Sequence, residues 1–328
     1  MVSVLKFSAC VMTCCTLPRC WGSLEHSKTV LLHLPRAFRA ASPSASAAAE
    51  TLLYDACIAR AVSRASSSLI IVLDEEDYCC EVVSNIYSTA WECATVADNC
   101  ELEVNVLIYG FLPRDAQNIV VLPEVCPRPN VVLGVAEESR MLLGAGREDS
   151  AEFESLETIM EIQARGIEGA VLLDDKEATT PKLKRVAVGG TFDRLHSGHK
   201  KLLTAAAELS CDSVLVGLAT GDLIGSKQGA KLIQPFETRA AAVARFLAMI
   251  KPELKVDVVA LEDPMGPALT DQELEGLVVS SETLAGGGSI NSARTALGLG
   301  PLVICVMRRT QQASLSSSGL RNYQFRST

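Results

Sequence analysis

Two of the four histidines lie three residues apart, a few residues after a pair of glycines. The stretch from Val186 to His199 reads VAVGGTFDRLHSGH. Its β-branched run, glycine turn and following Ala- and Leu-rich segment predict a strand, a turn and a helix. His196 and His199 then share one face at the start of that helix. Because glycines allow close backbone approach and a helix N-terminus carries unpaired N–H groups, the stretch predicts a phosphate site.

A serine run near the C-terminus is the second candidate for phosphate binding. Ser316, Ser317 and Ser318 precede Gly319, Leu320 and Arg321. A run of this kind is often a flexible tail, but small hydroxyls that open a helix also offer caps and free amides to phosphates. Its place after the last predicted strand favours the phosphate-binding interpretation.

These motifs need an α/β framework to bring them together. The second half of the chain predicts strands at 185–188, 213–219, 255–261, 277–280 and 302–307, and helices at 198–210, 236–251 and 290–297. Thr270 and Glu273 resemble a capping box for a short further helix. We expect a doubly wound, parallel five-stranded, Rossmann-like sheet, which binds its ligand at the carboxyl ends of the strands. Each polar motif follows such an end.

The first half of the chain predicts a second α/β domain. Strand-like runs lie at 29–34, 69–73, 104–111, 119–122 and 171–173, and helix-like segments at 46–65, 78–99 and 152–165. The acidic run 74–77 is typical of a solvated loop. No set of residues in this half points to catalysis, so its role stays open.

Composition shifts divide the chain into four parts. We expect an N-terminal tail at 1–27, an α/β domain at 28–175, a charged linker at 176–184 and the motif-bearing domain at 185–328. The tail has features of a targeting segment, because Glu25 is the single acid among the first 49 residues. We expect a cytoplasmic protein, with mitochondrial targeting as the alternative.

The overall composition excludes several classes of partner. The chain has 328 residues, 48% of them apolar, and a net charge of −9, which argues against nucleic-acid or membrane-surface binding. Its 12 cysteines include no C-x-x-C pair, so zinc ribbons find no support. The oligomeric state stays open.

The stretch GGTFDRLHSGH resembles the signature of the HxGH nucleotidyltransferase superfamily. Further segments recur in order, namely SKQGAKLIQPFETR, LEDPMGPA, VVSSET, INSAR and SLSSSGLR. Together they are similar to the phosphopantetheine adenylyltransferase domain of eukaryotic coenzyme A synthases and archaeal relatives, over about 184–321. The resemblance implies transfer of AMP from ATP to 4′-phosphopantetheine, giving dephospho-coenzyme A and pyrophosphate in coenzyme A biosynthesis. Mg²⁺ would bridge the phosphates without dedicated protein ligands.

The resemblance also implies roles for single residues. Catalysis would rest on Thr191, which holds the acceptor phosphate, on His199 at the α-phosphate, and on Lys227. The remaining ATP- and phosphate-binding residues would be Gly190, Phe192, His196, Arg294, Ser316, Ser317, Ser318 and Arg321. Lys231 competes with Lys227, and Arg239 is either a family phosphate contact or a solvent-facing helix residue. Where relatives often place a basic residue or proline, this chain has Ala285 followed by three glycines.

Other functions remain as alternatives. A cytidylyltransferase of a phospho-alcohol would carry RTxGIST near its C-terminus, and the spacing after Arg309 and Thr310 differs from that motif. A non-catalytic scaffold would keep the fold without the activity. A bifunctional coenzyme A synthase would need a kinase domain with a Walker A loop, and the chain contains no Gly-Lys dipeptide. We therefore expect a monofunctional adenylyltransferase.

Overall fold

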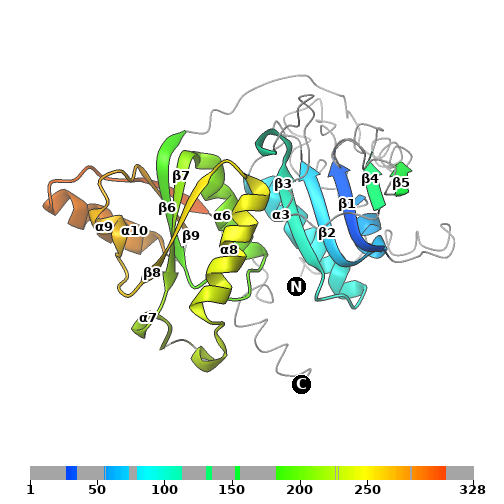
Figure 1. The fold of residues 1–328 in the computed structure, drawn as a ribbon, viewed down its shortest axis with the longest axis horizontal. Coiled ribbons are helices and arrows are strands. Elements are labelled where there is room, and N and C mark those ends of the chain that lie inside the picture. The colour runs from blue at the N-terminus through cyan, green and yellow to red at the C-terminus, as the bar shows by residue number, and fades with distance from the viewer. Residues whose placement is uncertain are drawn as a thin grey trace, which may run out of the picture. The chain divides into compact units, whose positions relative to one another are not determined.

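The structure of the chain is a computed structural model. It describes residues 27–34, 55, 57–73, 80–112, 131–134, 152–155, 182–225, 227, 229–280 and 283–307. The chain divides into two compact units, Met1–Glu177 and Ala178–Thr328. Figure 1 shows one parallel sheet in each unit.

The sheet of the second unit has five parallel strands, as the sequence predicts. They are β6 (Leu183–Gly190), β7 (Ser210–Ala219), β8 (Lys255–Leu261), β9 (Gly276–Ser280) and β10 (Val303–Met307). Their spatial order is β10-β9-β6-β7-β8. The chain therefore reverses its direction of travel across the sheet between β6 and β9, which is where doubly wound folds bind ligands. β6 begins at Leu183, inside the segment expected to be a linker.

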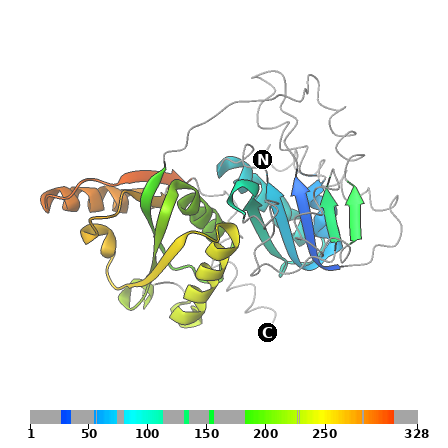
Figure 2. The ribbon, with the colours of Figure 1, turned by 45° about the horizontal axis from the view of Figure 1, so that its top comes forward.

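Helices cover both faces of this sheet (Figure 2). α6 (Ser197–Leu209) and α8 (Phe236–Ile250) follow β6 and β7 and contact each other on one face. The short α9 (Pro267–Thr270) and α10 (Leu284–Ala296) lie together on the other. Two short elements, α7 (Asp222–Gly225) and the 3₁₀ turn η5 (Ala230–Leu232), lie between β7 and α8. The α9–α10 face encloses an apolar cluster that includes Leu215, Leu277 and Ile290.

Two helix predictions in this unit need correction. α10 begins at Leu284, six residues before the expected start, and runs through the glycine triplet. Gly287 explains part of this, because a Cβ there would lie 3.3 Å from Ile304 Cδ1, so the glycine lets α10 pack close to the sheet. The capping box expected at Thr270 is wrong. α9 ends at Thr270, and the Glu273 N–H donates to Asp271 Oδ1 instead.

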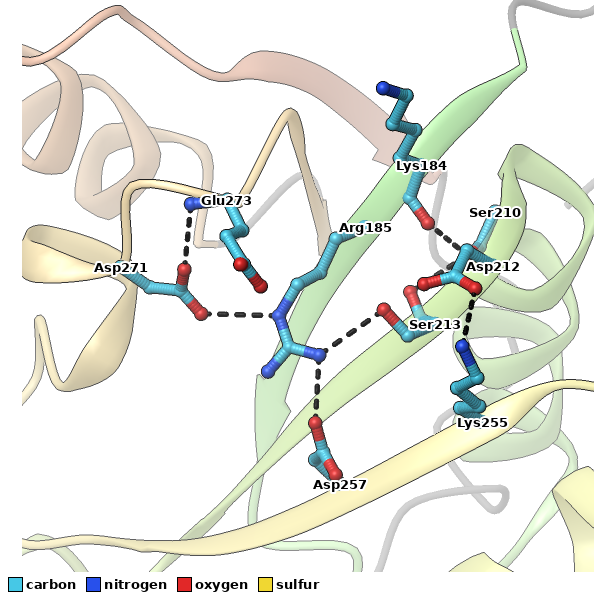
Figure 3. Close-up of polar contacts among 9 residues, drawn as sticks. All are labelled: Lys184, Arg185, Ser210, Asp212, Ser213, Lys255, Asp257, Asp271 and Glu273. Carbon is cyan, nitrogen blue, oxygen red and sulfur yellow. Dashed lines mark hydrogen bonds and ion pairs between the residues drawn. The ribbon is translucent and has the colours of Figure 1, made fainter.

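A charged cluster joins the amino-terminal ends of the strands (Figure 3). Arg185, at the start of β6, donates through Nη1 to Asp257 Oδ2 at 2.7 Å and through Nε to Asp271 Oδ2 at 3.1 Å. The same Nη1 donates to Ser213 Oγ on β7. The cluster therefore ties three strands and the segment after α9 at the edge opposite the expected ligand edge.

The first unit also contains a parallel five-stranded sheet. Its strands are β1 (Ser27–Leu34), β2 (Ala65–Leu73), β3 (Glu103–Ile108), β4 (Val131–Gly134) and β5 (Glu152–Ser155), in the order β3-β2-β1-β4-β5. Residues 57–64 are helical, α3 covers Cys80–Val96, and the 3₁₀ turn η3 (Tyr109–Phe111) follows β3. One face of the sheet packs against the helical residues in a core that includes Leu32, Ile71 and Tyr87.

Some predictions for the first unit differ from its structure. The segment expected to be helical at 152–165 begins with strand β5, which pairs in parallel with β4. The residues Glu152 to Ser155 read EFES, an alternating pattern that suits a strand once β4 offers a partner. β4 itself was not predicted. The expected strands at 119–122 and 171–173 and the acidic run 74–77 lie outside the described residues. None of the described helices is long and apolar enough to cross a bilayer.

Candidate active site

The turn after β6 has an unusual backbone. Phe192 and Arg194 adopt φ angles of 49° and 46°, in the left-handed region that side chains larger than glycine seldom occupy. The Phe192 ring is fully buried. A Cβ on Gly190 would lie 3.1 Å from Phe192 Cε2, so the ring folds back over the bare glycine. Strained backbone of this kind persists when its surroundings hold it, and it is common at functional sites.

An ion pair with a buried carboxylate, together with one glutamine, holds this turn. The Asp193 carboxylate is fully buried and accepts hydrogen bonds from Arg194 Nη1 at 3.0 and 3.2 Å. Gln234, just before α8, donates its N–H to Asp193 Oδ1 at 3.0 Å, and its Oε1 accepts from the Arg194 N–H at 2.8 Å. These three residues join the turn after β6 to the loop after β7.

The two histidines stack at the start of α6. Their ring centroids lie 3.9 Å apart with an interplanar angle of 26°. His196 is the N-cap residue, and its Nδ1 accepts from the Gly198 N–H at 3.1 Å. Because Nδ1 acts as an acceptor, the proton of the neutral His196 ring is on Nε2.

His199 is held in its neutral form. Burial, and then the charges of His196 and Lys227, lower the pKa of His199 well below its usual value. The ring packs against Phe192 at a centroid distance of 5.1 Å. Its Nδ1 is buried and has no hydrogen-bond partner among the described residues. An unpaired lone pair there costs less than an unpaired N–H, so we place the proton on Nε2, where it can be donated to a ligand.

Lys227 reaches the turn from the loop after β7. Its Nζ donates to Thr191 Oγ1 at 2.5 Å. Because the hydroxyl oxygen accepts this bond, its own O–H is left to donate to a ligand. Thr191, His199 and Lys227, the three residues expected to be catalytic, are therefore neighbours. Lys231 is exposed on η5, on the same loop.

Of the two positions considered for Arg239, a phosphate contact or a solvent-facing helix residue, the solvent-facing one is wrong. The side chain is 1% exposed, and Nη1 donates to the carbonyls of Thr191 at 2.7 Å and Ala219 at 3.1 Å. Nε donates to the Gln234 carbonyl at 2.9 Å. Arg239 therefore binds the backbone of the site from the protein interior.

The phosphate contact expected for Arg294 also needs correction. Arg294 lies in the last turn of α10, is 2% exposed, and donates to the carbonyls of Gly300, Ala268 and Asp271 at 2.8 to 2.9 Å. Asp271 binds Arg185 at the amino-terminal end of β6. A helix that follows a parallel strand starts at the carboxyl edge and ends at the opposite edge. Arg294 is thus at the wrong edge to reach a nucleotide beside His199.

The remaining predictions at this site have mixed outcomes. Ser316, Ser317, Ser318 and Arg321 lie outside the described residues, so their phosphate contacts stay predictions. The roles of Asp193, Arg194 and Gln234 were not predicted from the sequence. The signal for Asp193 was its place inside the glycine–histidine stretch, whereas nothing local distinguishes Gln234 from other polar loop residues.

Comparison with known proteins defines the class of this site. Residues 187–323 match the cytidylyltransferase-like family. The phosphopantetheine adenylyltransferase of Methanopyrus kandleri is 42% identical over 126 residues, which cover 38% of this chain and 79% of that protein. The enzyme of the same name from Pyrobaculum aerophilum is 41% identical over 143 residues, covering 43% of this chain and 91% of that protein.

A third relative is larger. The phosphopantetheine adenylyltransferase of Saccharomyces cerevisiae is 36% identical over 172 residues, which cover 52% of this chain. The chain spans about half the length of this relative, 53%. With two archaeal relatives covered over most of their length, the chain belongs to the phosphopantetheine adenylyltransferase family.

Proposed function

We propose that this chain transfers the AMP group of ATP to the phosphate of 4′-phosphopantetheine, releasing pyrophosphate and forming dephospho-coenzyme A. The observation that carries the proposal is the meeting of Thr191, His199 and Lys227 at the carboxyl end of β6, beside the point where the strand order reverses. The names of the relatives support the choice of ATP and 4′-phosphopantetheine as substrates.

The reaction needs positioning more than proton transfer. An oxygen of the acceptor phosphate attacks the α-phosphorus and forms a new P–O bond. The bond from that phosphorus to the oxygen bridging to the β-phosphate breaks, and pyrophosphate leaves with the electron pair. Since a phosphate monoester has its second pKa at about 6, the attacking group is already ionised at neutral pH and no general base is required.

The residues divide this work by charge and geometry. Lys227 supplies a positive charge to the phosphates, where negative charge grows in the transition state. The Thr191 hydroxyl accepts a hydrogen bond from Lys227 and donates one to the acceptor phosphate. It therefore holds the attacking phosphate close to the Lys227 ammonium. Neutral His199 donates Nε2–H to the α-phosphate without adding charge. His196, whose Nδ1 caps α6, would contact the same triphosphate through Nε2.

Mg²⁺ would enter this site with the triphosphate. The site residues offer ammonium, imidazole and hydroxyl donors, which suit phosphate oxygens better than a magnesium ion. Within the described ranges no three His, Cys, Asp or Glu side chains gather as a metal site. The ion, when bound between phosphates, would neutralise part of their charge. Chelation with EDTA should then abolish turnover, and added Mg²⁺ should restore it.

The direct test is an assay of pyrophosphate release with purified chain, ATP and 4′-phosphopantetheine, with the nucleotide product identified by mass. We expect dephospho-coenzyme A as the product, and no coenzyme A even with excess ATP because the chain contains no Gly-Lys dipeptide for a Walker A loop. CTP with choline phosphate or ethanolamine phosphate is the matched control. The proposal would be contradicted if pyrophosphate were released only with CTP and its phospho-alcohol. It would also be contradicted if neither substrate pair released pyrophosphate.

A further inference from the structure

We propose that Arg239 is a positioning residue that fixes the orientation of the Thr191–Phe192 peptide, so that the Phe192 N–H faces the phosphates of the nucleotide and the Thr191 carbonyl does not. The inference rests on the proposed function, in that it assumes a nucleotide at this site. It assigns Arg239 no contact with the substrate.

The first observation is the number of backbone segments that this one side chain holds. Nη1 of Arg239 donates to the carbonyl of Thr191 in the turn after β6 and to that of Ala219 at the end of β7. Nε donates to the carbonyl of Gln234 in the segment before α8. These segments are far apart in the sequence, and a planar guanidinium is the side chain best able to join them.

The second observation is that this placement is electrostatically costly. Arg239 lies in the first turn of α8, where the positive end of the helix dipole disfavours a cation. Burial also lowers the pKa of the guanidinium, with the Asp193 carboxylate opposing that effect. A buried charge is retained where its hydrogen bonds are needed, and here they all go to backbone carbonyls.

The third observation is the geometry of the Thr191–Phe192 peptide. In a trans peptide the carbonyl of one residue and the N–H of the next point in opposite directions. Arg239 holds the Thr191 carbonyl on the buried side, so the Phe192 N–H points to the opposite side of the turn. No backbone acceptor takes this N–H within the part of the chain that the structure describes. An unpaired amide beside Lys227 and His199 is a ready donor to a phosphate oxygen.

The backbone at Phe192 explains why a clamp is needed. Its φ of 49° is a strained value for a non-glycine residue. Rotation of the Thr191–Phe192 peptide would relieve that strain and turn the Thr191 carbonyl oxygen toward the phosphates. Gln234 reinforces the clamp, since its carbonyl accepts from Arg239 while its N–H and side chain bind Asp193 and Arg194.

The test uses three variants of the full chain. Arg239→Met removes the clamp, and Arg239→Lys keeps the charge but cannot reach three carbonyls at once. Arg245→Met is the matched control, because Arg245 is exposed on the same helix. Thermal unfolding of each variant shows whether it folds. If Arg239→Met does not fold, Arg239→Lys alone provides the test.

The specific readout is the Phe192 amide itself. The chain has eight phenylalanines, so ¹⁵N-phenylalanine labelling gives few NMR signals, and Phe192→Leu identifies the relevant one. We expect ATP to shift the Phe192 signal in the wild type and in Arg245→Met, and to leave it unmoved in both Arg239 variants. The kcat/KM for ATP should fall about 10²-fold in Arg239→Met, the loss typical of one oxyanion-hole donor.

The outcomes separate this inference from the proposed function. If the Arg239 variants melt earlier but keep the Phe192 response and a kcat/KM within twofold of the wild type, Arg239 is merely structural and the inference is wrong. If the wild type makes no dephospho-coenzyme A, yet ATP shifts Phe192 in an Arg239-dependent way, the proposed function fails and the inference stands on nucleotide binding.

Discussion

At the scale of single residues, the stacked imidazoles are the feature with the most chemistry. With centroids 3.9 Å apart, His196 and His199 cannot both carry a charge without strong repulsion. His196 keeps Nδ1 as an acceptor to cap α6. The pair therefore presents neutral N–H donors to an anion, while Lys227 supplies the charge.

Replacing His199 tests this division directly. His199→Ala should lower kcat by at least about 10²-fold, because one preorganised donor to the developing charge is lost. Thermal unfolding should show a folded chain, since His199 is half-buried at the start of α6 and is not part of the apolar core. Pyrophosphate release under saturating ATP is the measurement. A rate near that of the wild type would remove His199 from the catalytic set.

The lowered pKa of His199 also predicts a pH dependence of stability. In the folded chain His199 binds its proton less tightly than in the unfolded chain, where its pKa is about 6.5. Below that pH the unfolded state binds more protons, so this contribution to stability is present above pH ~6.5 and is lost as the pH falls toward the folded pKa. Midpoints of urea unfolding from pH 7.5 to 5 measure it.

His199→Gln is the control for this pH dependence. The variant cannot titrate at this position, so its unfolding midpoint should fall less between pH 7.5 and 5 than that of the wild type. Parallel curves for the two proteins would show that His199 does not contribute to the acid sensitivity.

At the scale of elements, the site depends on where strands end. β6 ends in two glycines at the carboxyl edge, and α6 starts there with its capped N-terminus. The buried Asp193 carboxylate, with Arg194 and Gln234, then fixes the loop after β7 against this turn. The loop carries Lys227, so tertiary hydrogen bonds, rather than local sequence, bring the cation to Thr191.

The glycine run of α10 gives an element-scale prediction. Gly286 has open space around the position of a Cβ and no positive φ, whereas Gly287 packs against Ile304. Gly286→Ala should therefore raise the free energy of unfolding by about 0.5–1 kcal/mol, because alanine loses less backbone entropy in a helix. Gly287→Ala, the matched control, should give a smaller gain or none. Urea unfolding measures both, and equal gains would show that Gly287 is not a packing position.

An element could be predicted from the sequence when its own residues determine its structure. Strand β8 was predicted with the bounds 255–261 that the structure has, since its apolar alternation and flanking polar residues are local. The start of α10 was missed because glycine's low helix propensity is overridden by packing on the sheet. β5 was mistaken for a helix because four residues form a strand only when β4 offers its edge.

At the scale of the whole molecule, both units use the same arrangement of five parallel strands. Each has its own apolar core, one including Leu32 and Ile71 and the other Leu215 and Leu277. The residues that match the cytidylyltransferase-like family, 187–323, lie in the second unit, and the relative from Pyrobaculum aerophilum is 91% covered by 143 aligned residues. The whole Pyrobaculum aerophilum protein is therefore only slightly longer than this unit.

A truncated chain tests whether the first unit is needed for chemistry. A chain that begins at Asp174 should fold cooperatively and keep kcat within about twofold of the full chain, because the described catalytic candidates and their supports all lie after that residue and the second unit has its own apolar core. Circular dichroism melting and the pyrophosphate assay are the measurements. A folded but inactive fragment would show that the first unit contributes to catalysis.

The sequence alone determined the fold class of the second unit, the strand–turn–helix that holds the glycines and histidines, and the family, because these depend on periodicity and on motifs with fixed short spacing. Only the tertiary structure decided the roles of the arginines. Arg239 was open between a phosphate contact and a solvent-facing position, and Arg294 was expected at the phosphates, yet both donate to backbone carbonyls in the interior. An arginine in the sequence does not reveal which acceptors its guanidinium will bind. Those partners depend on which loops the folded sheet brings within hydrogen-bonding distance of it.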